Sequence, residues 1–263
     1  MDIIWGIASY NRPDKQYMLN YLHGLGYPKE QILLSTQTTR DYEEYTRLFG
    51  DKATVIYREG ENVGDNKNSL LDYYCANYKD AHLVICSDKV KAVQYLGADK
   101  KTHKIEKREH LEAIVRKAFY LADYYGAELW GCYTTSNAFF MSHTTTINAL
   151  LIGCFMGIVN PQRLRFDREQ PLKEDFEVVL RTISQGGCVL RFNDICLAAT
   201  FHSKGGSYEL WHAEGDSVNK RCNDRLLARY PNLIAKHPTR ANEQKYVGKS
   251  TKLNYSIINI KKQ

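Results

Sequence analysis

The sequence predicts an α/β protein with a central, mostly parallel sheet flanked by helices. Short apolar segments alternate with amphipathic ones through the first half of the chain, the pattern that βαβ units produce. The 263 residues are 43% hydrophobic and 25% charged, near the average for globular proteins. The longest apolar run, residues 149–159, contains two glycines and is too short to span a bilayer as a helix. We therefore expect a soluble protein without a membrane anchor.

Apolar segments in the first half predict buried strands, and helical spacing of apolar side chains between them predicts helices. The predicted strands are residues 3–8, 31–36, 53–57 and 81–86. The predicted helices are residues 17–25, 41–49 and 66–78, the first of which is stopped by Gly26 and Pro28. Ligands bind beyond the carboxyl ends of strands in such sheets. We therefore expect the binding loops at residues 9–14, 60–68 and 87–90.

The second half is less regular. Residues 97–108 are polar and basic, which predicts a surface loop, and residues 148–158 fit either a packed helix or a strand. The predicted helices are residues 110–126, 174–186 and 216–230. The predicted strands are residues 129–133, 139–141, 188–192, 195–201 and 255–260. Because no repeat or clear linker divides the chain, we expect one domain over residues 1–235 and a basic extension over residues 236–263.

The cysteines and the N-terminus indicate a reducing compartment. None of the seven cysteines forms a C-x-x-C pair, which argues against a zinc ribbon or a thioredoxin-type site. Most lie in apolar segments, where small buried thiols are common in cytosolic proteins. Met1 leads directly into Asp2 and an apolar segment without a preceding basic stretch, so no secretory signal is expected. We expect a cytoplasmic protein.

The net charge of +6 is concentrated at the C-terminus. Residues 236–263 carry seven basic residues against the single acid Glu243, a net charge equal to that of the whole chain. Such segments attract phosphate backbones or other acidic partners, although a basic tail can also serve solubility alone. The candidate contacts to a nucleic-acid backbone are Lys245, Lys249 and Lys252, with Arg221 and Arg225 on the preceding predicted helix.

Four motifs occur in a characteristic order along the chain. The first predicted strand ends in Ser9-Tyr10-Asn11-Arg12-Pro13, and a loop at residues 61–68 opens the helix that follows. Ser87-Asp88-Lys89 then follows an apolar strand, and Glu174-Asp175 starts a later helix. This order resembles that of GT-A-type nucleotide-sugar glycosyltransferases, which have a Rossmann-like sheet.

The resemblance implies a role for each motif. Those implied to bind the nucleotide sugar are Ser9, Asn11, Arg12, Gly64, Lys67, Asn68, Ser87, Asp88 and Lys89. Asp175 would be the catalytic base, with Glu174 in its place if the register is shifted by one residue. A carboxylate at a helix start is also favoured by the helix dipole alone.

Shorter matches in the second half narrow the resemblance. Gly205-Gly206-Ser207, the predicted helix around residues 219–225 and Lys245-Tyr246-Val247-Gly248 look like the TET/JBP-associated DNA glycosyltransferases of phages. That family implies transfer of a hexose or pentose from a nucleotide donor, such as UDP-glucose, to a hydroxymethylated pyrimidine in double-stranded DNA. It also implies the cytoplasm of a host cell. Two alternatives are a polysaccharide or protein acceptor, and a degenerate domain that binds nucleic acid without catalysis.

The metal-binding motif departs from the family pattern. Only Asp88 of Ser87-Asp88-Lys89 is a carboxylate, whereas Mg²⁺ and Mn²⁺ prefer hard oxygen ligands. One reading places a divalent cation on Asp88, the substrate phosphates and waters, with His202 completing the shell. In a second reading Lys89 takes the place of the metal, because an ammonium group also neutralises a diphosphate. In a third the site is degenerate.

Overall fold

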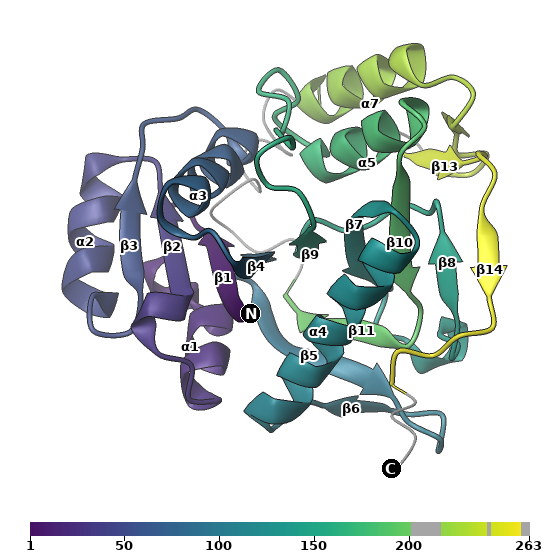
Figure 1. The fold of residues 1–263 in the computed structure, drawn as a ribbon. Coiled ribbons are helices and arrows are strands. Elements are labelled where there is room, and N and C mark those ends of the chain that lie inside the picture. Colours follow the sequence, from purple (N-terminus) through teal and green to yellow (C-terminus); the bar gives the residue numbers. More distant parts are fainter. Residues whose placement is uncertain (201–216, 241–242, 259–263) are drawn as a thin grey trace.

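A computed structural model of the chain describes residues 1–200, 217–240 and 243–258. In these residues a nine-stranded sheet runs through the molecule in the order β14-β8-β10-β7-β9-β4-β1-β2-β3 (Figure 1). Its strands are β1 (Asp2–Ala8), β2 (Ile32–Thr36), β3 (Thr54–Tyr57), β4 (Ala81–Ser87), β7 (Ala127–Cys132), β8 (Thr145–Ile147), β9 (Phe155–Ile158), β10 (Cys188–Phe192) and β14 (Thr251–Leu253). Only β8 and β9 in this sheet run against the other strands. The predicted α/β class with a mostly parallel sheet is confirmed.

Helices cover both faces of the sheet because the buried strands are apolar on both sides. Ile3, Trp5 and Ile7 of β1 pack in one cluster with α1 (Tyr17–Gly24), α2 (Thr39–Phe49) and α4 (Arg108–Tyr124). Ile4, on the opposite face of β1, packs in a second cluster with α3 (Val63–Asn77) and α5 (Glu174–Ser184). The helix α7 (Ser217–Arg229) lies outside α5, with Leu226 against Leu180. The result is a three-layer arrangement with α7 added on one side.

Two small sheets and three short 3-10 helices complete the described part. One sheet has the order β11-β5-β6, formed by β11 (Ile195–Ala199), β5 (Val90–Leu96) and β6 (Thr102–Lys104). The other pairs β12 (Ile234–Lys236) with β13 (Gln244–Tyr246). The 3-10 helices are η1 (Pro13–Lys15), η2 (Lys29–Gln31) and η3 (Ala138–Phe140). In the described residues, no helix combines the length and the apolarity that crossing a bilayer requires.

Four predicted elements differ in the structure. Residues 97–108 are not a plain loop, because β6 lies within them and pairs with β5. Residues 139–141 do not form a strand: they overlap η3, whose start is capped by Asn137 and whose two phenylalanines are exposed. Of residues 148–158 only Phe155–Ile158 is strand, and the described residues 255–258 contain none.

The described C-terminal residues pack against the body of the molecule. The strand β14 pairs with β8 at one edge of the large sheet. Beyond it, Ser256 donates a 2.5 Å hydrogen bond to buried Asp194, and the Lys117 ammonium donates to the carbonyl of Ile257 at 2.9 Å. Residues 243–258 are therefore part of the folded body of the protein.

Candidate active site

A cavity of about 740 Å³ lies at the carboxyl ends of β1 and β4. The chain progresses from β1 through β2 to β3 on one side, while β4 pairs with β1 on the other. The direction of progression therefore reverses between β1 and β4, and open α/β sheets bind ligands at such a switch point. Ala8 from the end of β1 and Ser87 from the end of β4 form the floor.

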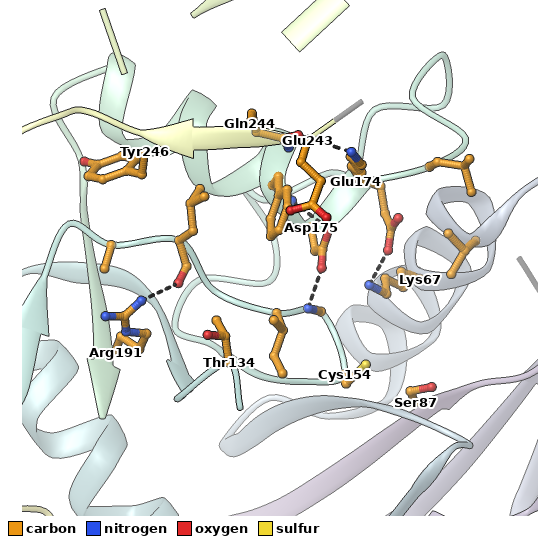
Figure 2. A pocket seen from close by; sticks show the side chains of 18 of the residues that line it. Lys67, Ser87, Thr134, Cys154, Glu174, Asp175, Arg191, Glu243, Gln244 and Tyr246 are labelled. Carbon is orange, nitrogen blue, oxygen red and sulfur yellow. Dashed lines mark hydrogen bonds and ion pairs between the residues drawn. The ribbon is translucent and has the colours of Figure 1, made fainter. Parts of the chain in front are cut away.

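Four other segments form the walls (Figure 2). They are the first turns of α3, the segment 149–154 before β9, the start of α5 and the C-terminal segment around β13. Besides Ser87, the polar residues that line the cavity are Lys67, Lys89, Thr134, Thr146, Lys173, Glu174, Asp175, Arg191, Arg240, Glu243, Gln244, Tyr246 and Ser250. Basic residues outnumber acids in this set. The cavity therefore suits an anionic ligand.

Gly153 brings the two halves of the site together. A Cβ atom placed on it would lie 2.6 Å from the Lys67 Nζ atom and 2.7 Å from the Asp175 Cβ atom. Both distances are shorter than real Cβ contacts. Only glycine therefore lets the segment 149–154 pass between the α3 ammonium and the α5 carboxylate.

Lys67 and Glu174 form a buried ion pair. The Lys67 Nζ atom donates to Glu174 Oε1 at 2.7 Å, and the lysine also lies over the Phe166 ring at 4.9 Å. Burial alone would lower the pKa of Lys67, but the charges of Glu174 and Asp175 outweigh it and raise that pKa. Lys67 is therefore a permanent positive charge in the wall, and Glu174 is held by it.

Asp175 is held by backbone N–H groups. Its Oδ2 atom accepts from the Gly153 N–H at 2.7 Å, and its Oδ1 atom accepts from the Phe176 N–H at 2.8 Å. Burial, followed by the negative charge of Glu174, raises the pKa of Asp175 to about 6, while Lys67 and the two N–H groups oppose the shift. A carboxylate with a pKa near neutrality in a cavity is suited to accept a proton.

Asp88 does not line this cavity, because its side chain joins a buried network behind the floor. Its Oδ2 atom accepts from the Ser9 hydroxyl at 2.8 Å, and its Oδ1 atom lies 3.5 Å from the Arg12 guanidinium. Ser9 is also bonded to Tyr45 and Gln16, at 3.1 and 2.7 Å. Burial raises the pKa of Asp88, and Arg12 opposes that rise. Ser9, Arg12 and Asp88 thus support the cavity from outside.

Lys89 does line the cavity. Among the residues that the structure describes, its ammonium group has no hydrogen-bond acceptor or acid within bonding distance. Burial and the nearby charge of Arg12 lower the pKa of Lys89, against the effect of Asp88. The group is therefore a positive charge available to a ligand.

The other predicted donor-binding residues shape the loops around the cavity. The Asn68 side chain accepts from the Phe166 N–H at 2.8 Å and donates to the Phe166 carbonyl at 2.9 Å. Gly64 packs closely against the backbone of Asp167, and Asn11, with a φ of 49°, donates its N–H to Asp41. Of the nine predicted donor-binding residues, the structure places Lys67, Ser87 and Lys89 at the cavity.

The described residues do not fit a divalent cation. In residues 1–200, 217–240 and 243–258, no group of three or more His, Cys, Asp or Glu side chains could hold a metal ion. The predicted ligand Asp88 is already engaged by Arg12 and Ser9. The other predicted ligand, His202, lies outside the described residues. Hard cations need several oxygen ligands, and Ser87-Asp88-Lys89 presents an ammonium where a second carboxylate would stand.

Sequence reasoning missed the contribution of Lys173 and the C-terminal segment. Lys173 has a φ of 62°, and its ammonium donates to Asn223 at 2.5 Å and to Gln244 at 3.1 Å. Burial lowers its pKa to about 8, against the effects of Glu243 and Asp175. It thereby joins the start of α5 to α7 and β13. The position of Lys173 next to Glu174 in the sequence could have indicated that it lies at the site. No local pattern in residues 240–250 indicates that this segment lines a cavity.

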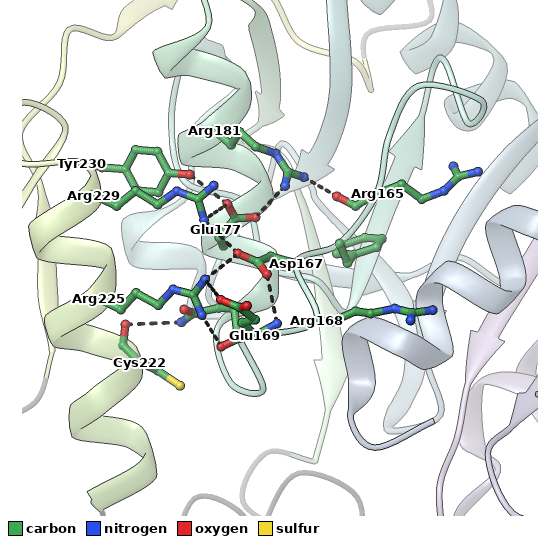
Figure 3. A network of polar contacts seen from close by, with 12 residues as sticks. Arg165, Asp167, Arg168, Glu169, Glu177, Arg181, Cys222, Arg225, Arg229 and Tyr230 are labelled. Atoms are coloured by element: carbon green, nitrogen blue, oxygen red, sulfur yellow. Dashed lines mark hydrogen bonds and ion pairs between the residues drawn. The ribbon is translucent and has the colours of Figure 1, made fainter. Parts of the chain in front are cut away.

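The predicted nucleic-acid contacts fall into two groups. Arg225 is engaged within the protein, with Glu169 at 2.7 Å and Asp167 at 3.2 Å (Figure 3). Arg221 is exposed, as are Lys245, Lys249 and Lys252. Since Gln244 and Tyr246 line the cavity, strand alternation directs Lys245 to the opposite side. These lysines are exposed near the cavity but do not line it.

Comparisons with known proteins give structural likenesses only. No protein-family model matches the sequence, and no curated protein matches it. The matching solved structures include residues 1–349 of TarS from S. aureus, with 11% identity and a TM-score of 0.48 over 86% of this chain. Another is the mannosyltransferase PcManGT from Pyrobaculum calidifontis in complex with GDP-Man and Mn²⁺, with 13% identity and a TM-score of 0.49 over 86% of this chain. The chain covers 66% and 61% of these structures. At these values the likeness assigns no activity, and the function has to be argued from the site.

Proposed function

We propose that the protein is a glycosyltransferase that moves a sugar from a nucleotide-sugar donor to a hydroxyl group. One observation carries the proposal: the cavity at the switch point holds both ammonium groups and Asp175, a carboxylate whose pKa is raised to about 6. Ammonium groups bind phosphates, and a carboxylate with such a pKa can take a proton from a hydroxyl group. The four motifs that resemble GT-A-type glycosyltransferases agree with this assignment.

The donor diphosphate belongs beside Lys89 and Lys67, on the floor formed by the ends of β1 and β4. An ammonium in a partly buried wall attracts a phosphate more strongly than one in water, because the surrounding dielectric constant is lower. We take the donor to be UDP-linked, as the resemblance implies, with UDP-glucose as the first compound to test.

In the reaction, the acceptor oxygen forms a bond with the anomeric carbon as the bond from that carbon to the donor phosphate breaks. The acceptor proton passes to Asp175, and the nucleoside diphosphate leaves with the electron pair of the broken bond. Asp175 is better placed for this role than Glu174, because Glu174 is held by the Lys67 ammonium at 2.7 Å. Within the part of the chain that the structure describes, the Asp175 carboxylate accepts hydrogen bonds only from neutral N–H groups.

We take the acceptor to be a hydroxymethylated pyrimidine in double-stranded DNA. The family resemblance and the exposed Lys245, Lys249 and Lys252 support it, since exposed cations bind a phosphate backbone. A polysaccharide or protein acceptor is the alternative within the same enzyme class. A domain that binds nucleic acid without catalysis is the alternative outside it.

The test is a transfer assay with UDP-glucose and duplex DNA that contains 5-hydroxymethylcytosine or 5-hydroxymethyluracil. Mass spectrometry of the digested DNA should show the mass of one hexose added to the modified base. Matched unmodified DNA should gain none. GDP-mannose, tested in parallel, covers a different nucleotide. Transfer to a glycan but not to DNA would overturn the acceptor, and failure to bind either nucleotide sugar would overturn the enzyme class.

A further inference from the structure

We propose that Lys89, and not a divalent cation, neutralises the donor diphosphate in this protein. This inference rests on the proposed function, because it assigns a binding partner within the same donor site. It states that donor binding needs no metal and that the ammonium of Lys89 stabilises the nucleoside diphosphate as it leaves.

The first support is the direction of the side chains at the end of β4. Ser87 and Lys89 line the cavity, whereas Asp88 between them does not. The only carboxylate of this motif thus lies behind the floor, whereas a cation bound in the cavity would need it in front. The motif presents an amine to the ligand instead of an acid.

The second support is the partner that Asp88 already has. The Arg12 guanidinium lies 3.5 Å from the Asp88 carboxylate, and both side chains are at least 95% buried. A metal ion on Asp88 would have to approach that guanidinium or displace it, and two cations in a low-dielectric interior repel each other strongly. Removing Arg12 from its partner would also leave a buried, unpaired charge, which is costly. The charge of Asp88 is therefore already balanced by Arg12 without a metal.

The third support is the charge balance of the cavity. Among the described lining residues, Lys67 is matched by Glu174 at 2.7 Å. Lys89 has no acidic partner among the described residues, although it lines the same floor. A bound diphosphate would supply the negative charge that balances the ammonium of Lys89. An added divalent cation would instead increase a positive excess.

The experiment is calorimetric titration of UDP and UDP-glucose into the full chain, once with EDTA and once with Mn²⁺. The variants are Lys89→Ala, Lys89→Arg and, as a matched control, Lys91→Ala, which removes an exposed lysine from β5 just beyond the motif. Thermal melting of each variant verifies that it folds.

The inference expects the wild type to bind UDP with the same affinity in EDTA and in Mn²⁺. Lys89→Ala should weaken binding roughly 10- to 100-fold in both, the size of one charge-assisted hydrogen bond, while Lys89→Arg keeps most of the affinity and Lys91→Ala all of it. Binding only with Mn²⁺, or wild-type affinity in Lys89→Ala, would overturn the role of Lys89 and leave the proposed function standing. Absence of nucleotide-sugar binding in both buffers, with GDP-mannose included, would overturn both.

Discussion

Asp175 is the residue whose protonation should control the reaction. Burial and Glu174 raise its pKa to about 6, so the carboxyl group holds a proton below that pH and cannot accept one from the acceptor. As pH falls below about 6, kcat/KM should therefore decrease about tenfold per unit, and above it the profile should flatten. Steady-state transfer rates between about pH 5 and pH 8 measure this.

Asp175→Asn separates that role from a structural one. We expect kcat to fall by about 10²- to 10⁴-fold, while UDP-glucose still binds, because the donor-binding residues Lys89 and Lys67 remain. The residual activity should lose the acidic limb near pH 6. An unchanged pH profile in this variant, or full activity, would show that Asp175 is not the base.

At the scale of elements, a buried carboxylate joins α5 to α7. Glu177 of α5 is fully buried and accepts from the Tyr230 hydroxyl at 2.8 Å, with Arg229 and Arg181 each at 3.3 Å (Figure 3). Asp167 accepts from Arg229 in the same network, at 2.8 Å. These interactions fix α7 on the helix whose first turn carries Glu174 and Asp175.

Glu177→Ala should therefore lower the free energy of unfolding by about 2–4 kcal/mol, because it leaves the Tyr230 hydroxyl without its acceptor and removes the buried carboxylate that pairs with Arg229 and Arg181. Glu169→Ala is the control, since it removes an ion pair whose carboxylate is 79% exposed, and it should cost less than about 1 kcal/mol. Urea unfolding of the two variants compares them. Equal losses would show that the buried network contributes no more than a surface pair.

The elements that the sequence predicts best are those with a clear hydrophobic pattern. The helix α4 and the strand β4 lie within a few residues of their predicted ranges, because the apolar residues of α4 repeat with the helical period and those of β4 form a continuous run. The sequence did not predict β5, nor the three-residue strands β6, β8, β12, β13 and β14, which are too short to show a hydrophobic period. The two phenylalanines of η3 led to the prediction of a buried strand at residues 139–141, but both are exposed. The sequence alone does not show whether an apolar residue is buried.

The same limit applies to the candidate site. Lys67, Lys89 and Asp175 could be singled out because each stands at a strand end or a helix start. Asp88 and Ser9 stand at the same ends, yet the structure turns their side chains into a buried network. Which way a side chain points is decided by partners distant in the chain, here Arg12 and Tyr45, and no local pattern contains that information.

At the scale of the whole molecule, the C-terminal residues have two roles to separate. Gln244 and Tyr246 line the cavity, and β14 extends the large sheet. Deleting residues 236–263 would therefore damage the cavity as well as remove positive charge. A test of DNA binding has to change the charge and leave the backbone in place.

Replacing Lys245, Lys249 and Lys252 by alanine does so, since all three side chains are exposed. If each lysine binds one phosphate, the slope of log K against log salt should fall by about 0.9 for each lysine removed, or about 3 in total. Fluorescence anisotropy with duplex DNA containing 5-hydroxymethylcytosine, over a range of KCl concentrations, measures the slope. UDP-glucose binding should not change.

The control replaces the exposed Lys29, Lys79 and Lys101, which removes the same charge from positions outside the cavity. Equal slopes for the two triple variants would mean that net charge, and not a C-terminal binding surface, draws the protein to DNA.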